Sequence, residues 1–139
     1  MENYSNFAEM KKIISILAVA LAFTIHANAQ KDFGGIARFD SMVMDFGTIS
    51  AADGPQSHTF TVTNIGKEDM VIYAVMTSCG CTKVNWTRET IAPGKTGTIS
   101  ATYSNDEGPY PFDKTLKAYI SGIDKPVILH MRGEVTKKK

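Results

Sequence analysis

The sequence has few of the residues on which metal centres and disulfide-rich folds depend. Its 139 residues include only two cysteines, too few for a disulfide-stapled miniprotein or a four-cysteine zinc site. Neither charge sign dominates, because the sequence has 15 basic and 14 acidic residues and a net charge of +1. This balance argues against a nucleic-acid partner. No enzyme signature of known spacing and no sustained helical stripe occur, so a small non-helical globular domain remains.

Long hydrophobic runs are also missing, apart from one near the N-terminus. Ile13 to Ile25 is uncharged but well short of the roughly 20 residues that span a bilayer. Two lysines precede this run, and Ala27-Asn28-Ala29 follows it as an A-x-A cleavage site. We predict that residues 1–29 are a signal peptide, cleaved before Gln30. The mature chain, residues 30–139, is then a single domain without membrane insertion, exported to the periplasm or the medium.

A period of two dominates the mature chain. Apolar and polar residues alternate in the segments 58–63, 98–103, 114–120 and 127–134, which predicts half-buried strands. Residues 70–76 are apolar on both faces and predict a central strand. Turn signals rich in glycine, proline and asparagine separate these runs. The pattern predicts an all-β fold, an immunoglobulin-like antiparallel β-sandwich of about seven strands, with a small Greek-key barrel as the alternative.

The inward positions of these strands define the expected core. It comprises Phe46, Ile49, Phe60, Val62, Ile72, Val84, Ile99, Leu116, Ala118, Ile120, Leu129 and Val135. We expect Trp86 to pack on the core or on the sheet surface. The two histidines of the mature chain, His58 and His130, are expected to face solvent. Neither has a partner pattern that predicts catalysis.

The stretch Thr77-Ser-Cys-Gly-Cys-Thr82 is the only one that carries distinctive chemistry. Side chains two apart on an ideal strand are too far from each other for a disulfide. Gly80 is expected to relieve this, because glycine adopts backbone angles that fold the tripeptide. An exported chain meets an oxidising compartment, so we predict a Cys79–Cys81 disulfide.

Four interpretations of this pair remain open. The first is structural, either a local disulfide or two buried thiols. The second is a redox-active dithiol, although no activating helix follows and Lys83 is the only positive charge nearby in sequence. The third is a copper(I) site formed by Cys79, Cys81 and Met76, because thiolates and thioethers select that ion. The fourth is pairing with a thiol of another protein.

Four stretches together resemble one bacterial family. They are Met44-Asp-Phe-Gly-Thr-Ile49, Phe60-Thr-Val-Thr-Asn-Ile-Gly66, Ser78-Cys-Gly-Cys-Thr82 and Ile91-Ala-Pro-Gly-Lys-Thr-Gly-Thr-Ile99. In this order they are similar to the exported envelope family known as domain of unknown function 1573. The resemblance implies an immunoglobulin-like sandwich related to the ASPM and Hydin domains. It singles out Cys79, Gly80 and Cys81 and implies no established activity.

We therefore predict a non-enzymatic envelope protein with no resident cofactor or metal. Its edge strands and end loops are suited to binding another envelope protein or to a structural role. We expect a monomer. The competing class is a thiol redox or copper(I)-binding protein that uses Cys79-Gly80-Cys81.

Overall fold

A computed structural model describes residues 30–137, and over this range the regular elements are nine β-strands. They are β1 (Lys31–Phe33), β2 (Ala37–Phe39), β3 (Val43–Ser50), β4 (Gln56–Asn64), β5 (Ile72–Thr77), β6 (Thr82–Trp86), β7 (Thr96–Tyr103), β8 (Pro111–Ile120) and β9 (Val127–Thr136). Within this part of the chain no helix is long and apolar enough to cross a bilayer. The predicted signal peptide, residues 1–29, lies outside the described residues.

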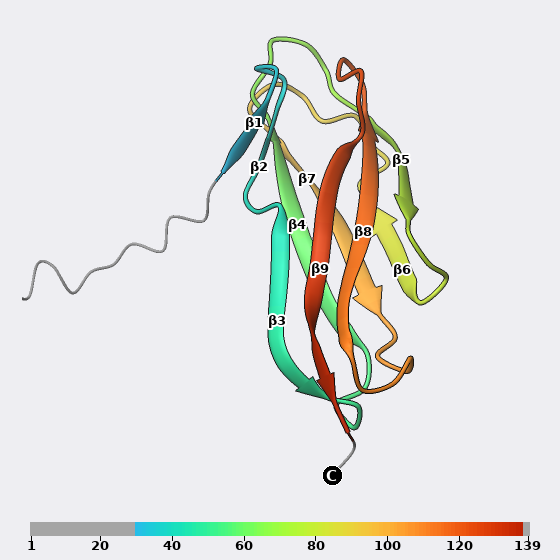
Figure 1. Cartoon of the computed structure of the whole chain (residues 1–139). Helices are drawn as coiled ribbons and strands as arrows, with labels where there is room; N and C mark the ends of the chain where they lie inside the picture. The colour runs from blue at the N-terminus through green and yellow to red at the C-terminus, as the bar shows by residue number, and fades with distance from the viewer. Residues whose placement is uncertain (1–29, 138–139) are drawn as a thin grey trace, which may run out of the picture.

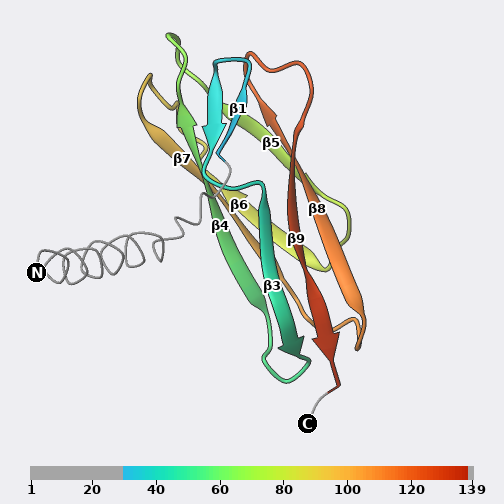
Figure 2. The same ribbon diagram turned by 60° about the vertical axis from the view of Figure 1, so that its left-hand side comes forward.

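The strands form two sheets that pack face to face (Figures 1 and 2). Sheet A has five strands in the order β1-β2-β4-β7-β6, and sheet B has four in the order β3-β9-β8-β5. The predicted all-β immunoglobulin-like sandwich is confirmed. The structure has two strands more than the expected seven. These are β1 and β2, and with three residues each they are too short to show a clear alternation.

One pairing departs from the expected antiparallel arrangement. β3 runs parallel to β9, in a register that places Met44 opposite Met131 and Ile49 opposite Val135. The register shifts between Asp45 and Thr48, where the chain bulges. The alternation pattern is the same in parallel and antiparallel strands, so the sequence could not reveal this direction.

The prediction of a central strand at residues 70–76 is wrong. β5 begins at Ile72 and is an edge strand of sheet B, paired only with β8. Its outward side chains are exposed, Tyr73 at 60% and Met76 at 58%. The second apolar face of this segment, which led to the prediction of a central strand, is thus exposed on the outside of sheet B. Met70 lies before the strand and forms an isolated bridge to Ile91.

The core lies between the sheets and matches the inward positions read from the alternation. Ten of the twelve expected core residues are buried, and the other two, Phe46 and Val84, are partly buried against the core. Trp86 is also partly buried there, as expected, and its Nε1 donates to the Ile72 carbonyl oxygen at 2.9 Å. This bond joins the edge of sheet A to the edge of sheet B.

Candidate functional site

The cysteine motif lies in an arch that crosses between the sheets. β5 ends at Thr77 and β6 begins at Thr82, so Ser78–Cys81 carry the chain from the edge of sheet B to the edge of sheet A (Figure 1). The Ser78 amide donates to the Thr115 carbonyl at 3.0 Å, and the Ser104 amide donates to the Cys81 carbonyl at 2.9 Å. These bonds fasten the arch to the middle of β8 and to the residue after β7.

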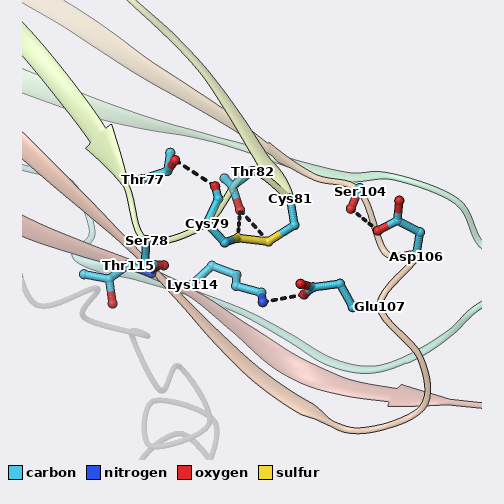
Figure 3. A network of polar contacts seen from close by, with 10 residues as sticks. All are labelled: Thr77, Ser78, Cys79, Cys81, Thr82, Ser104, Asp106, Glu107, Lys114 and Thr115. Carbon is cyan, nitrogen blue, oxygen red and sulfur yellow. Dashed lines mark hydrogen bonds and ion pairs between the residues drawn. A yellow bond between two sulfur atoms is a disulfide. The ribbon is translucent and has the colours of Figure 1, made fainter.

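The two cysteines lie close together in this arch. Their Cα atoms are 5.2 Å apart and their sulfurs are bonded to each other, a spacing in the ordinary range for disulfides. Both residues are partly buried. The hydroxyl oxygen of Thr82, a buried residue, lies 3.7 Å from the Cys79 sulfur and 3.8 Å from the Cys81 sulfur. The Thr77 hydroxyl donates to the Cys79 carbonyl at 2.9 Å (Figure 3).

Gly80 does not use the backbone freedom expected of it. Its φ lies outside the left-handed region, and a Cβ added at this position would meet no atom within 4 Å. The bend that brings the sulfurs together is therefore open to other small residues. The arch owes its shape to its hydrogen bonds with Thr115 and Ser104 rather than to glycine.

A partly buried cation and a carboxylate lie beside the disulfide. Lys114 shares the inward face of β8 with Phe112 and Leu116, and its side chain is only 14% exposed. Its Nζ forms an ion pair with Glu107 of the β7–β8 loop and lies 5.4 Å from the centre of the Tyr103 ring. A carboxylate oxygen of Glu107 lies within 4.8 Å of both cysteine sulfurs. Figure 3 shows Lys114 and Glu107 pointing toward one another next to the sulfur–sulfur bond.

Tyr103 closes the inner side of this cluster. It is fully buried and stacks on Phe112 with 4.3 Å between ring centres. Its hydroxyl is buried without a hydrogen-bond partner. Burial, and after it the negative charge of Glu107, raise the pKa of Tyr103 to about 12. The phenol is therefore neutral at physiological pH.

The cluster also bears on metal binding. Two sulfurs and one carboxylate oxygen lie within 4.8 Å of one another, so the reduced pair would offer two thiolates and a hard oxygen ligand. A carboxylate suits zinc better than copper(I), which prefers sulfur. Met76, the third residue of the predicted copper site, is 58% exposed on the outer face of β5 and does not fill the core. The copper interpretation stays a prediction.

The two histidines have different environments. His130 lies on the outer face of sheet B, as expected, with its Nδ1 2.7 Å from Asp113 Oδ1. His58 was expected to face solvent and does not. It shares the inward face of β4 with Phe60, packs edge-on against that ring at 4.6 Å, and has a buried Nε2 with no hydrogen-bond partner. Burial lowers the pKa of His58, although the charge of Asp40 opposes this effect.

The outer faces of the two sheets differ in chemistry. Four large hydrophobic residues are exposed in the described chain, and Val43, Tyr73 and Met76 belong to sheet B. On sheet A the exposed positions of β4 and β7 carry hydroxyls that bond across the strands, such as Thr59 with Ser100 at 2.9 Å. One outer face is thus partly apolar and the other is lined by serine and threonine.

Lys114, Glu107 and Tyr103 were missed as site residues by sequence reasoning. The sequence places Lys83 nearest to the cysteines, but Lys83 is exposed on β6. A usable signal existed at Lys114, since a lysine in phase with Leu116 and Ala118 occupies a core-facing position. Glu107 gave none, because its approach to the sulfurs depends on the course of the β7–β8 loop.

Comparison with solved structures places the chain among immunoglobulin-like sandwiches. A protein of unknown function from Porphyromonas gingivalis W83 matches with a TM-score of 0.61 and 17% identity, over 81% of this chain and 50% of that one. The VesB protease of Vibrio cholerae matches with a TM-score of 0.55 and 18% identity, over 83% of this chain and 34% of that one. The chain thus spans half or less of either protein, and at these identities the likeness shows the fold alone.

A human domain gives a match of similar size. The ASH / PapD-like domain 7 of human CEP192 has a TM-score of 0.59 and 8% identity, and the match covers 78% of this chain and 91% of that domain. The predicted likeness in fold to ASH-type immunoglobulin-like sandwiches is therefore confirmed, and at this identity it concerns the fold alone. The comparison with curated proteins found no match. The family described as a protein of unknown function (DUF1573) matches residues 37–135, and the chain belongs to that family.

Proposed function

We propose that this chain is an exported, non-enzymatic immunoglobulin-like module that binds another envelope protein. The observation that carries the proposal is the exposed apolar surface on β5 and β8. We call this surface, formed by Tyr73, Met76, Lys117 and Tyr119, the β5 face. Large exposed side chains of this kind mark interaction surfaces when they are contiguous, and Tyr and Met are enriched at protein interfaces.

Contacts within the β5 face support its continuity. The rings of Tyr73 and Tyr119 lie 6.0 Å apart, and Met76 is opposite Lys117 in the strand register. The exposed ammonium of Lys117 adds one positive charge to the apolar surface. The chemistry fits an extended segment of an exported protein that has aromatic or aliphatic side chains and an acidic residue.

The non-enzymatic part of the proposal rests on the state of the reactive groups. In the bonded form neither Cys79 nor Cys81 is a free thiol nucleophile. His130 faces the open outer side of sheet B beside Asp113. Neither environment pairs a free nucleophile with a general base.

Site-specific photocrosslinking tests the proposal. A photoreactive phenylalanine analogue replaces Tyr73 in the full chain, expressed in its own cell envelope. The matched control carries the analogue at Thr59, on the hydroxyl-lined outer face of sheet A. We expect one discrete adduct from position 73 and none from position 59, because only the β5 face offers apolar area to a partner.

A second variant assigns the adduct to the β5 face. Met76→Asp should abolish the adduct from position 73, and Thr61→Asp on sheet A should leave it unchanged. Equal crosslinking from positions 59 and 73, or none from position 73, would refute the proposal. An adduct of twice the chain's mass would identify a second copy rather than another protein as the occupant.

A further inference from the structure

We propose that the Cys79–Cys81 disulfide is a thiol–disulfide exchange site that oxidises a dithiol of another exported protein. This activity goes beyond protein binding at the β5 face and does not depend on it. It is stoichiometric, with one dithiol oxidised for each chain, until another oxidant restores the bond. Three features of the arch support it: accessibility, weak coupling to folding, and groups that stabilise a leaving thiolate.

The disulfide lies in a turn that is exposed at Gly80. Cys79 and Cys81 are partly buried and Gly80 between them is exposed, so the arch presents the bond at the surface where the sheets meet. A Cβ at Gly80 would meet nothing within 4 Å, which shows open space around the turn. Exchange requires that an incoming thiolate reach a sulfur, and exposed disulfides are the labile ones.

The bond is also weakly coupled to the stability of the fold. It closes a loop with a sequence separation of only two residues, and so short a loop removes little entropy from the unfolded chain. The arch keeps its other anchors, the hydrogen bonds to Thr115 and Ser104. Folding therefore does little to hold the sulfurs oxidised, unlike a structural disulfide that closes a long loop.

Two groups stabilise the sulfur that leaves. The Thr82 hydroxyl lies within 3.8 Å of both sulfurs and can donate to whichever becomes a thiolate. The Lys114 ammonium lies beside the bond, paired with Glu107, whose carboxylate is within 4.8 Å of both sulfurs. A cation next to a cysteine lowers its thiol pKa. Lys114 thus favours the reduced state, whereas Glu107 opposes it, because its carboxylate pairs with the ammonium and carries a negative charge within 4.8 Å of both sulfurs.

The exchange balances as follows. A thiolate of the partner dithiol attacks one cysteine sulfur, forms a mixed disulfide, and the electron pair of the broken bond passes to the other cysteine. The second partner thiolate then attacks its own mixed-disulfide sulfur and releases the first cysteine. The partner loses two electrons and becomes a disulfide, and the pair gains them. The two thiol protons end on Cys79 and Cys81, or one passes to water while a thiolate remains beside Lys114.

Glutathione titration of the full exported chain tests the site. The fraction of reduced pair is measured by alkylation and intact mass across ratios of reduced to oxidised glutathione, at about pH 8. We expect reduction in buffers that leave structural disulfides intact. Lys114→Met should lower the equilibrium constant for reduction, by at most about tenfold for each unit that it adds to the pKa of a thiol, because only the ionised fraction of the pair at this pH contributes. Glu107→Gln should raise it, and Lys114→Arg should restore the original value.

Lys83→Met is the matched control, because Lys83 is the cation nearest in sequence but is exposed on β6. It should change nothing. The thiol pKa of the reduced pair is measured from the thiolate absorbance against pH. Lys114→Met should raise this pKa and Glu107→Gln should lower it, whereas residues with a purely structural role would leave it unchanged. If Lys114→Met does not fold, Glu107→Gln tests the proposal by itself, through the direction in which it changes the equilibrium constant for reduction.

Three results would overturn the proposal. One is a pair that stays oxidised in the most reducing glutathione buffer. Another is the same equilibrium constant in Lys114→Met, Glu107→Gln and Lys83→Met. The third is a large fall in the denaturant midpoint of unfolding on reduction, since it would show that the bond holds the fold together.

Discussion

Lys114 illustrates how one side chain in the first half of a core strand changes the chemistry of a surface loop. It occupies an inward position of β8, where its neighbours Phe112 and Leu116 are buried. Glu107 provides the lysine with a partner of opposite charge at the surface. The result is a fixed cation beside the disulfide, held by packing rather than by a flexible surface contact.

The buried phenol of Tyr103 should lower the stability of the fold at alkaline pH. Its pKa is about 12 in the folded chain and about 10 in the unfolded chain. The folded state holds the proton more tightly, so this contribution is complete below pH 10 and is lost as the pH rises through 12. We expect the unfolding free energy to fall by about 2 kcal/mol between pH 9 and pH 11.5.

Denaturant unfolding at several pH values measures this loss. Tyr103→Phe should remove it and leave stability near neutral pH unchanged or slightly higher, because the hydroxyl has no hydrogen-bond partner. Tyr73→Phe, at a 60% exposed position, is the control and should retain the decline. An identical decline in Tyr103→Phe would contradict the assignment.

An added methyl group should destabilise the fold at Gly133 and have almost no effect at Gly80. A Cβ at Gly133 would lie 2.9 Å from the Gly47 carbonyl oxygen and 3.1 Å from the Phe112 ring, at the bulge where β3 meets β9. Gly133→Ala should cost about 1–3 kcal/mol of unfolding free energy, because backbone must move. Gly80→Ala should change it by less than about 0.5 kcal/mol. Equal costs in thermal or denaturant unfolding would show that the arch needs its glycine.

The oxidation state of the pair can be decided by mass. Alkylation of the exported chain without reductant should add no group to Cys79 or Cys81, because the compartment oxidises them to each other. Two groups added before copper(I), and none after its anaerobic addition, would favour the copper interpretation. Two groups under both conditions would leave idle thiols.

At the scale of elements, Asn64 fixes the loops at one end of the sandwich. It is completely buried at the end of β4, and its amide donates to the Glu68 and Ile91 carbonyl oxygens, both at 2.7 Å. Its side-chain oxygen accepts from the Gly66 amide at 2.9 Å. One side chain therefore ties the β4–β5 loop to the segment before β7.

Asn64→Asp should destabilise the fold by about 2–4 kcal/mol. The substitution keeps the shape but replaces two donors with a buried carboxylate facing two carbonyl oxygens. Asn85→Asp is the matched control, because Asn85 is exposed and its side-chain oxygen, which accepts from the Trp86 amide, is retained. Denaturant unfolding of both variants measures the difference, and similar costs would show that Asn64 is not a fixed anchor.

The sequence predicted which residues point inward far better than where each strand lies in its sheet. Alternation located the buried faces of β4, β7, β8 and β9 because burial imposes the same period on all of them. It failed for β5, since Tyr73 and Met76 are apolar yet exposed. Local pattern also cannot report which strand becomes a neighbour, so the parallel β3–β9 pair was not foreseen.

For the candidate site, too, the sequence predicted the local features but not the contacts between distant residues. Local spacing identified Cys79 and Cys81, and the chain bends them together without help from a left-handed glycine. The residues that tune them, Glu107 and Lys114, lie more than twenty positions away and reach the arch only through the pairing of β5 with β8. Contacts of this kind follow from topology, which a single sequence does not specify.

For the whole molecule, export remains a prediction that the N-terminus can test. The mature chain should begin at Gln30, because cleavage follows Ala29 of the A-x-A site. Intact mass and N-terminal sequencing of the protein from the envelope fraction measure this start. Ala29→Asp should block cleavage and leave a longer, membrane-retained form, whereas an unshortened wild-type chain would contradict the signal peptide.

The place of β9 sets the moment at which the sandwich can be completed. This strand of ten residues lies inside sheet B between β3 and β8, and β3 has no other neighbour there. Asp45 and Arg132, which pair across the two strands, are 87 positions apart in sequence. Closing so long a loop is slow, because its entropy cost precedes any gain from contacts. Until residues 127–136 have left the ribosome or the export channel, β3 has no strand to join, and sheet B cannot be completed.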